Sequence, residues 1–240
     1  MANSKIKFFS PVEVTGPHTG WELQTGGNPS LARQRASVLK SDGDELAAVQ
    51  YGAQYSYTEN YTASAFSGNM TVPNVGAVKN GAHVDSVSVA YSQTAAPTLA
   101  VNSHKHATVD GTAIEHDACR EYEPSIILPA RAIGVPVTLK KKAGDTAVFT
   151  LPEGVGIRSL SYQLQCTHVD ENDGNGDHLA GDNYDGVETL TIEFTGEVDV
   201  ADLNLDADWM KPDSFAHTNG NTQATTTSMT LTHHVAHKSA

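Results

Sequence analysis

The 240-residue chain has few cysteines, which cross-link small folds, and few basic residues, which bind anions. It has two cysteines, which excludes a disulfide framework, and we expect both to be free thiols in a cytoplasmic product. Lysine and arginine number 15 against 28 acidic residues, a net charge of −13. This shortage of positive charge argues against a protein that grips nucleic acid or an anionic membrane surface, because both partners favour basic patches.

Long hydrophobic runs are also absent. No stretch approaches the roughly 20 apolar residues of a membrane span, so we expect no membrane partner. Residues 1–10 are too short and too charged for the apolar core of a signal peptide. We therefore expect a protein made in a cytoplasm, and its hydrophobic fraction of 39% is that of a folded chain.

Motifs for catalysis are missing. The sequence contains no nucleophile elbow, phosphate-cradling glycine loop, H-E-x-x-H helix or dinucleotide fingerprint. Acids such as Glu188 and Glu193 could form a glycosidase pair in almost any acidic β-protein. The sequence predicts no enzyme, no catalytic residue and no cofactor.

Alternating apolar and polar residues recur along the chain and predict strands with one solvated face. We therefore expect an all-β protein of antiparallel β-sandwich or barrel units. We expect Cys166 to share a buried face with its apolar neighbours. The alternating apolar residues are Val87, Val89 and Tyr91; Leu160, Tyr162, Leu164 and Cys166; Leu190, Ile192 and Phe194; Met229 and Leu231.

A turn signal over residues 41–44 (SDGD) lies between two apolar runs, 36–39 and 46–49. An Asp-Gly pair in that position favours a long hairpin that continues through Tyr51, Tyr55 and Tyr57. The alternative is a short helix that begins at Pro29 and runs to about Lys40. We favour the hairpin, because Gly43 would end a helix there in either case.

The two halves of the chain share a short pattern of an apolar residue and proline, then Val-Gly, then apolar-x-Ser-apolar-Ser-apolar. It occurs over residues 72–89 and again over 151–162, and chance similarity between strands is the alternative to duplication. We predict a first β unit with the long hairpin over 31–135, an exposed connection near 130–143, and a second β unit with an acidic insertion over 144–231. Residues 1–30 and 232–240 are predicted to be an N-terminal arm and a C-terminal tail that a partner would order.

Negative charge is concentrated in one segment. Between Arg158 and Lys211 there is no basic residue, and thirteen acidic residues supply the entire net charge. A solvated face is the simpler interpretation. The alternatives are a surface that repels an anion or one that binds a cation.

Residues 170–177 have the composition of a calcium loop, since hard cations prefer several oxygen ligands on a turn that glycine permits. The spacing imitates an EF-hand but departs from it at both ends, and strand patterns flank it where helices are required. A polar hairpin tip is the simpler interpretation. The candidate calcium ligands are Glu171, Asp173, Asn175, Asp177 and Asp182.

Histidines and a cysteine in the middle of the chain supply ligand types that zinc prefers. His104 and His106 would point to one face of a strand, and His116 and Cys119 follow them. The spacing between the two pairs matches no common zinc module, so ordinary surface or interface histidines are the simpler interpretation. These four residues are the candidate zinc ligands.

The style of the chain resembles that of bacteriophage virion structural proteins, and within them of tail tube proteins. The resemblance rests on the early hairpin around residues 41–44, the Thr/Ser-rich strand faces, residues 167–190 and the closing residues 229–235 (MTLTHHV). It covers most of the chain but includes no diagnostic motif, so it assigns no functional residue.

The resemblance implies β-sandwich units that join their sheets around a ring of six, rings that stack, and an acidic, polar lumen. DNA would slide through such a lumen without sticking, because acidic groups repel phosphate. If the halves are duplicated, three chains would supply the six units. The implied partners are further copies of the chain, other virion proteins and phage DNA in passage, all within the virion.

Two other functions remain open. A capsid decoration or head-to-tail joining protein has the same composition and differs only in its assembly geometry. A cation-dependent β-sandwich binding module would use the loop over residues 170–185.

Overall fold

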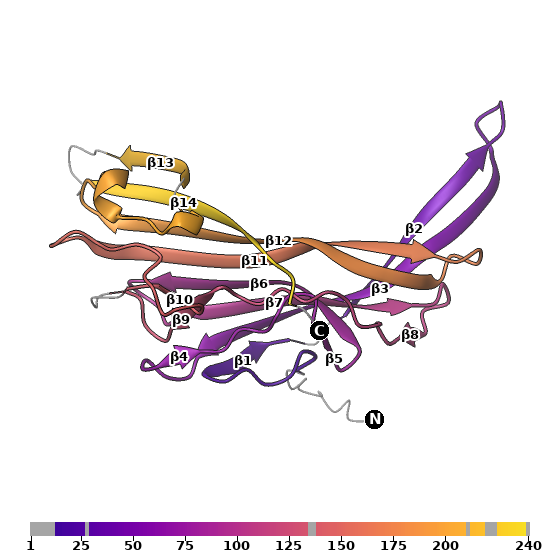
Figure 1. Cartoon of the computed structure of the whole chain (residues 1–240). Coiled ribbons are helices and arrows are strands. Elements are labelled where there is room, and N and C mark those ends of the chain that lie inside the picture. The colour runs from indigo at the N-terminus through magenta and orange to yellow at the C-terminus, as the bar shows by residue number, and fades with distance from the viewer. Residues whose placement is uncertain (1–12, 27–28, 134–137, 210–211, 219–224, 239–240) are drawn as a thin grey trace, which may run out of the picture.

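Antiparallel strands dominate the computed structural model, which describes residues 13–26, 29–133, 138–209, 212–218 and 225–238 (Figure 1). The strands are β1 (Trp21–Thr25), β2 (Ser30–Leu39), β3 (Glu45–Ala63), β4 (Asn69–Met70), β5 (Val78–Lys79), β6 (Ala82–Ser92), β7 (Thr98–Ala107), β8 (Ala113–Ile114), β9 (Ile126–Pro129), β10 (Lys140–Lys141), β11 (Gly156–Asn172), β12 (His178–Thr195), β13 (Pro212–Thr218) and β14 (Thr226–Val235). Two short 3-10 helices, η1 (Val200–Leu203) and η2 (Ala207–Trp209), are the helices of the described part. The predicted all-β class is confirmed.

Eleven strands form one large sheet, in which the path runs β1-β3-β7-β6-β11-β12-β14-β13. The predicted long hairpin is confirmed, because β2 pairs with β3 from Ser30 opposite Ser56 to Leu39 opposite Glu45. Among the described strands, β13 has one hydrogen-bonded neighbour and so does β2. The path does not close on itself, which leaves a sandwich as the architecture.

One face of the large sheet carries the core. The apolar residues predicted from the alternation, except Cys166, are buried in rows that cross the strands, because residues two apart on a strand point to one face. Val89 lies opposite Tyr162, Tyr162 opposite Leu190, and Leu190 opposite Leu231. These four side chains are fully buried.

A second, smaller layer covers this face. Strands β10, β9 and β4 form a three-stranded sheet, and apolar residues of β9 and the following segment belong to the same core cluster as the large sheet. The Tyr91 hydroxyl on β6 donates to the carbonyl of Pro129 on β9 at 2.8 Å. The predicted exposed connection near 130–143 is exposed only in part: Lys142 and Ala143 are exposed, but Leu139 is fully buried. Pro136 lies outside the described residues.

The two predicted β units are not separate bodies. The segments that share the internal pattern fall on β6 and β11, which lie side by side and antiparallel at the centre of the sheet. Both halves also contribute to one core cluster. The pairing of β6 with β11 thus joins residues 31–135 and 144–231 in one continuous sheet.

The predicted terminal arms are wrong for their described parts. The Glu59 carboxylate is buried and accepts hydrogen bonds from the backbone N–H groups of Val14 and Thr15 at 2.6 and 3.1 Å, and β1 pairs with β3. Residues 1–12 lie outside the described part. At the other end, β14 runs on to Val235 and pairs with β12, so the predicted tail begins as a strand of the sheet.

Neither described helix, of four and three residues, has the length and hydropathy needed to span a bilayer.

Candidate functional site

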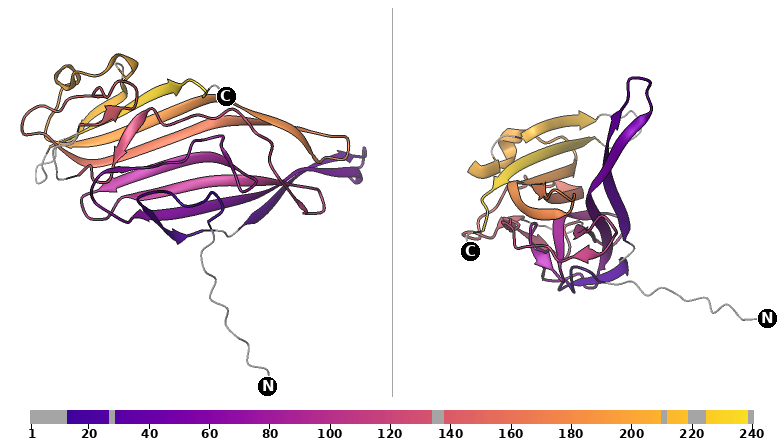
Figure 2. Two further views of the ribbon diagram at one scale, coloured as in Figure 1. Left: turned by 60° about the horizontal axis from the view of Figure 1, so that its bottom comes forward. Right: turned by 90° about the vertical axis from the view of Figure 1, so that its right-hand side faces the viewer.

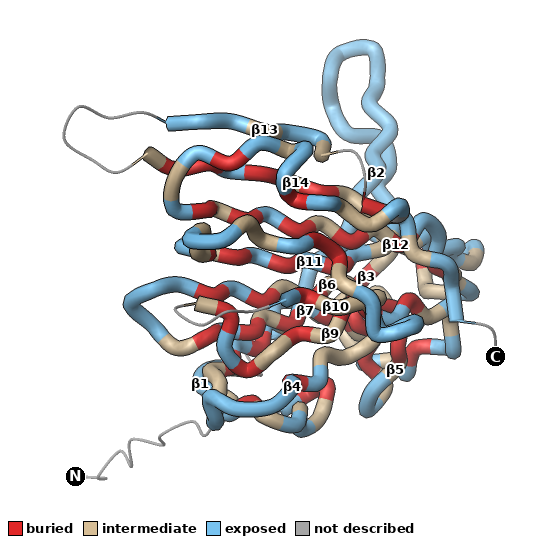
Figure 3. The backbone as a smooth tube through the Cα atoms, turned by 60° about the vertical axis from the view of Figure 1, so that its left-hand side comes forward, coloured by how far each residue is buried: buried red, intermediate tan, exposed pale blue. Residues whose placement is uncertain are grey.

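Strand β2 and the first part of β3 form a two-stranded ribbon that projects from the sheet (Figures 1 and 2). Every residue from 29 to 50 is exposed, as the pale ribbon in Figure 3 shows. We call residues 30–50 the hairpin arm. None of the residues of the arm belongs to the buried core cluster, and an isolated two-stranded ribbon is at best marginally stable in water.

Apolar side chains are concentrated on the hairpin arm. The described chain leaves nine large hydrophobic residues exposed, and five of them lie here: Leu31, Val38, Leu39, Leu46 and Val49, with exposed fractions of 37% to 64%. Exposed apolar side chains gathered on one element indicate an interaction surface. One ion pair, between Arg35 and Glu45, lies across the ribbon.

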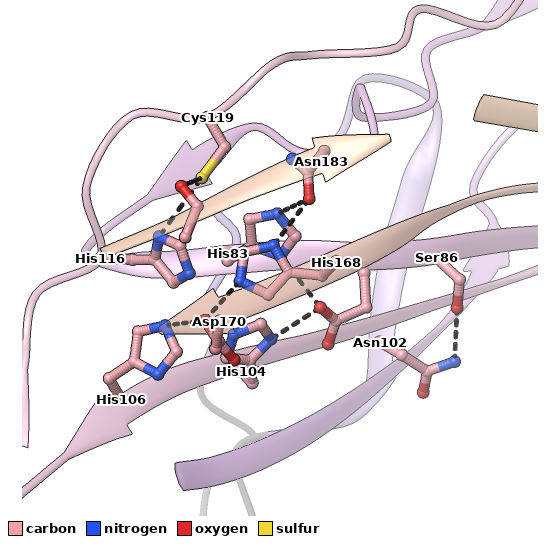
Figure 4. Close-up of polar contacts among 12 residues, drawn as sticks. His83, Ser86, Asn102, His104, His106, His116, Cys119, His168, Asp170 and Asn183 are labelled. Atoms are coloured by element: carbon pink, nitrogen blue, oxygen red, sulfur yellow. Dashed lines mark hydrogen bonds and ion pairs between the residues drawn. The ribbon is translucent and has the colours of Figure 1, made fainter. Parts of the chain in front are cut away.

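Six histidines converge beside the base of the arm, and we call them the histidine cluster; Figure 4 labels all of them except His178. They come from four neighbouring strands and one loop: His83 on β6, His104 and His106 on β7, His116 after β8, His168 on β11 and His178 on β12. The centroids of their contacting rings lie 3.5 to 6.2 Å apart. His106 lies opposite Gln54 of β3, which places the cluster where the arm leaves the sheet.

Bulges re-aim the strands as they enter the cluster. The register shifts on β6 between Val84 and Ser86, and on β11 between Gln165 and Thr167. A bulge adds a residue to one strand and redirects the side chains that follow it. Alternation along β6 and β11 therefore does not predict on which face of the sheet His83 and His168 lie, because each is separated from most of the core residues of its strand by a bulge.

Several buried nitrogens of the cluster have no hydrogen-bond partner. They are Nε2 of His104, His106 and His116, and both ring nitrogens of His178. The first three residues are 3% to 6% exposed. Leaving a buried polar group unpaired costs about 1–3 kcal/mol, so the arrangement lacks a partner that would satisfy these nitrogens.

Carboxylates hold the other side of several rings. Oδ1 of Asp85 lies 2.6 Å from Nδ1 of His104 and 2.9 Å from Nδ1 of His83. Oδ1 of Asp170 lies 2.8 Å from Nε2 of His168, and 3.3 Å from Nε2 of His106 and Nδ1 of His178, two contacts without hydrogen-bond geometry. A histidine whose one nitrogen is held by a carboxylate presents the other for a ligand.

Burial controls the protonation of the unpaired rings. Burial lowers the pKa of His106, His116 and His178. The pKa of His116 falls to about 4. Burial also acts on His168, but hydrogen bonds to Asp170 and Asn183 and the nearby acidic charges outweigh it and raise the pKa. At neutral pH the rings of His106, His116 and His178 are therefore uncharged, which is the form that binds metal ions.

The predicted zinc ligands do come together. His104, His106 and His116 belong to one group with His168, whose offered nitrogens all lie within 4.8 Å of one another. Sγ of Cys119 lies 3.8 Å from Nδ1 of His116 and groups instead with His83 and His168. Sequence reasoning missed His83, His168 and His178, because their positions far apart in the chain signal no common site.

Both cysteines are free and half-buried, which confirms the predicted thiols, although Cys166 is less buried than its apolar neighbours on β11. Burial raises the pKa of Cys119 to about 11 and that of Cys166 to about 12. Both thiols are protonated at neutral pH, which makes them poor nucleophiles.

Three of the predicted calcium ligands are bound to other groups of the protein. Asp173 closes the tip between β11 and β12, where its Oδ1 accepts from the backbone N–H groups of Asn175 and Asp177. Asp177 accepts from the backbone of Val109, and Asp182 pairs with Arg120. Among the described residues, Glu171, Asp173, Asp177 and Asp182 belong to no convergent group of potential ligands.

The acidic segment is not one solvated face. Glu188 is fully buried, Asp206 pairs with Lys141 and Glu193 with Arg158. Other carboxylates, such as Asp185, Asp199 and Asp202, are exposed. Some carboxylates of this segment are therefore buried or form ion pairs within the protein, and others contribute negative charge to its surface.

The chain matches no protein-family model and no curated protein.

Proposed function

We propose that the protein is a self-assembling structural subunit of a bacteriophage virion, a tail tube subunit that forms stacked rings around a DNA-conducting lumen. The observation that carries the proposal is the hairpin arm, a fully exposed ribbon with apolar side chains and no core of its own. Such a ribbon gains its stability by packing against another surface. Because the sequence resembles tail tube proteins, we propose that this surface belongs to a second copy of the chain.

The edges of the large sheet support the same assembly. The path of the sheet ends at β13 and at β1, and each of these strands has one hydrogen-bonded neighbour among the described strands. Open edges favour pairing with another chain. Joining sheets edge to edge closes a ring and covers these edges. Because both halves of the chain share one sheet, we propose that one chain supplies one unit and that six chains form a ring.

Charge suits the lumen of a tube. The exposed carboxylates of the acidic segment and the net charge of −13 repel the phosphates of DNA, so the polymer passes without being bound.

The first test is negative-stain electron microscopy with mass photometry on the full chain. We expect rings of six and stacked tubes. Isolated trimers or single unstacked rings would favour capsid decoration or head-to-tail joining, and monomers at high protein concentration would overturn self-assembly.

A shortened arm tests the contact itself. Replacing residues 35–50 with Asn-Gly joins Gln34 to Tyr51, which lie opposite each other, through a two-residue hairpin turn. We expect this variant to fold, because none of the deleted residues belongs to the core cluster, and to lose stacking. A double substitution, Leu39→Ser with Leu46→Ser, should weaken stacking. The control is Phe66→Ser, which changes an equally exposed residue away from the arm and should leave stacking unchanged. Tubes of wild-type length formed by the shortened chain would refute the role of the arm.

A further inference from the structure

We propose that the histidine cluster binds one Zn²⁺ ion per chain, with His104, His106 and His116 as ligands through Nε2 and His168 as the fourth ligand. This site is independent of the proposed assembly role.

The hydrogen bonds within the cluster select the first three ligands. Nε2 of each of the first three histidines is buried and has no hydrogen-bond partner. Nδ1 of His104 is held by Asp85, and Nδ1 of His116 by the carbonyl of Asp117 at 2.8 Å. In both rings the tautomer that satisfies Nδ1 leaves the lone pair of Nε2 free for a metal.

The spacing suits a tetrahedral ion. Zn²⁺ binds imidazole nitrogens at about 2.1 Å, which places the nitrogens of a tetrahedron about 3.4 Å apart. The offered nitrogens of His104, His106, His116 and His168 all lie within 4.8 Å of one another. Binding the ion therefore requires the rings to rotate toward it, and His168 to exchange one of its two hydrogen bonds, to Asn183 or Asp170, for the ion.

The chemistry of the donors favours a transition metal. Four imidazole nitrogens suit Zn²⁺ and neighbouring divalent ions, whereas Ca²⁺ and Mg²⁺ require oxygen ligands. Asp85 and Asp170 surround the site with two carboxylates, which balance the charge of a buried dication.

The ion would join three parts of the chain beside the base of the hairpin arm. His104 and His106 lie on β7, His168 on β11, and His116 in the segment after β8. Because an ion that binds only the folded chain stabilises it, Zn²⁺ should fasten that segment to the sheet.

The test uses the full chain without a polyhistidine tag, purified without metal affinity. We expect elemental analysis to find one Zn²⁺ per chain, and the chelator-stripped protein to bind Zn²⁺ with a rise in melting temperature and to ignore Ca²⁺. Co²⁺ in place of Zn²⁺ should give the visible spectrum of a tetrahedral site, a readout that needs no variant. An octahedral Co²⁺ spectrum or a stripped protein that takes up no Zn²⁺ would overturn the proposal.

Variants assign the ligands. His106→Gln and His116→Gln should each lower Zn²⁺ affinity by about a hundredfold or more, and Asp85→Asn, which removes the carboxylate behind His104, by about 10- to 100-fold. His234→Gln is the matched control, because that side chain is 72% exposed and pairs with Asp185 outside the cluster. Wild-type Zn²⁺ affinity in both ligand variants would refute the site. A stoichiometry of two ions per chain would overturn the single site. It would favour two separate sites, one formed by His83, Asp85 and His104 and the other by His106, Asp170 and His178.

Discussion

At the scale of single residues, Glu188 shows how a carboxylate can become part of the core. Its Oε1 accepts from the backbone N–H of Ser125 at 2.5 Å and from the Tyr162 hydroxyl at 2.6 Å. Its Oε2 accepts from the Ser125 hydroxyl and lies 2.9 Å from Nδ1 of His233. Burial and the charge of Glu188 raise the pKa of Tyr162 well above its ordinary value, so the tyrosine remains a donor.

Glu188→Gln should destabilise the chain. The substitution replaces one carboxylate oxygen with an NH2 group, which cannot accept the hydrogen bonds that this oxygen now accepts. Leaving a buried donor unpaired costs about 1–3 kcal/mol, and we expect a lower urea midpoint with an unchanged slope. Glu193→Gln, which disturbs only a half-exposed ion pair with Arg158, should change stability by less than about 0.5 kcal/mol. Equal midpoints for the two variants, at one protein concentration, would contradict the structural role of Glu188.

Individual histidines illustrate where sequence reasoning ends. His104 and His106 are two residues apart on a strand, a spacing that by itself indicates a shared face. His83, His168 and His178 reach the same place only through the pairing of β6, β7, β11 and β12. Local spacing carries no information on such pairing, so half of the cluster could not be predicted.

At the scale of elements, alternation predicted the central strands well, because one buried face imposes a period of two. Prediction was poorer where a bulge shifts the register, as at Cys166 on β11, and where a segment without alternation is anchored by a single group. The N-terminal segment is of the second kind, since Glu59 holds Val14 and Thr15 through hydrogen bonds to their backbone.

The loop that carries His116 and Cys119 is seated against β12 at Gly186. A Cβ added at Gly186 would lie 2.1 Å from Cδ1 of Tyr122, whose ring is buried. Gly186→Ala should therefore displace this ring and destabilise the chain by about 1–3 kcal/mol, measured as a lower melting temperature. Gly174→Ala, at the tip between β11 and β12 with nothing within 4 Å, should leave the melting temperature unchanged, and a neutral Gly186→Ala would show that the loop can shift freely.

At the scale of the whole molecule, the internal pattern predicted two units and the structure joins them in one sheet. Each of the two segments that carry the pattern ends in a strand, β6 and β11. These strands lie side by side through a long-range pairing, which a local pattern cannot specify. The total charge, in contrast, is a property that composition alone determines.

The charge gives a prediction of its own. In the tail tube role proposed above, the protein should not retard duplex DNA in a gel at physiological salt, because a net charge of −13 opposes the phosphate contacts on which non-specific binding depends. A basic protein of similar mass serves as the positive control. Retardation by low micromolar protein would contradict a lumen through which DNA passes freely.

The central seam of the sheet also determines how the newly made chain finds its fold. Ser86 on β6 pairs with Gln165 on β11, so the middle of the sheet forms only after a long loop has closed. Non-local pairing of this kind slows folding, because the entropy of loop closure is lost before the contacts are gained. We therefore expect monomers to fold slowly compared with a helical protein of this size, and the two halves to remain exposed to mispairing until the last strands have left the ribosome.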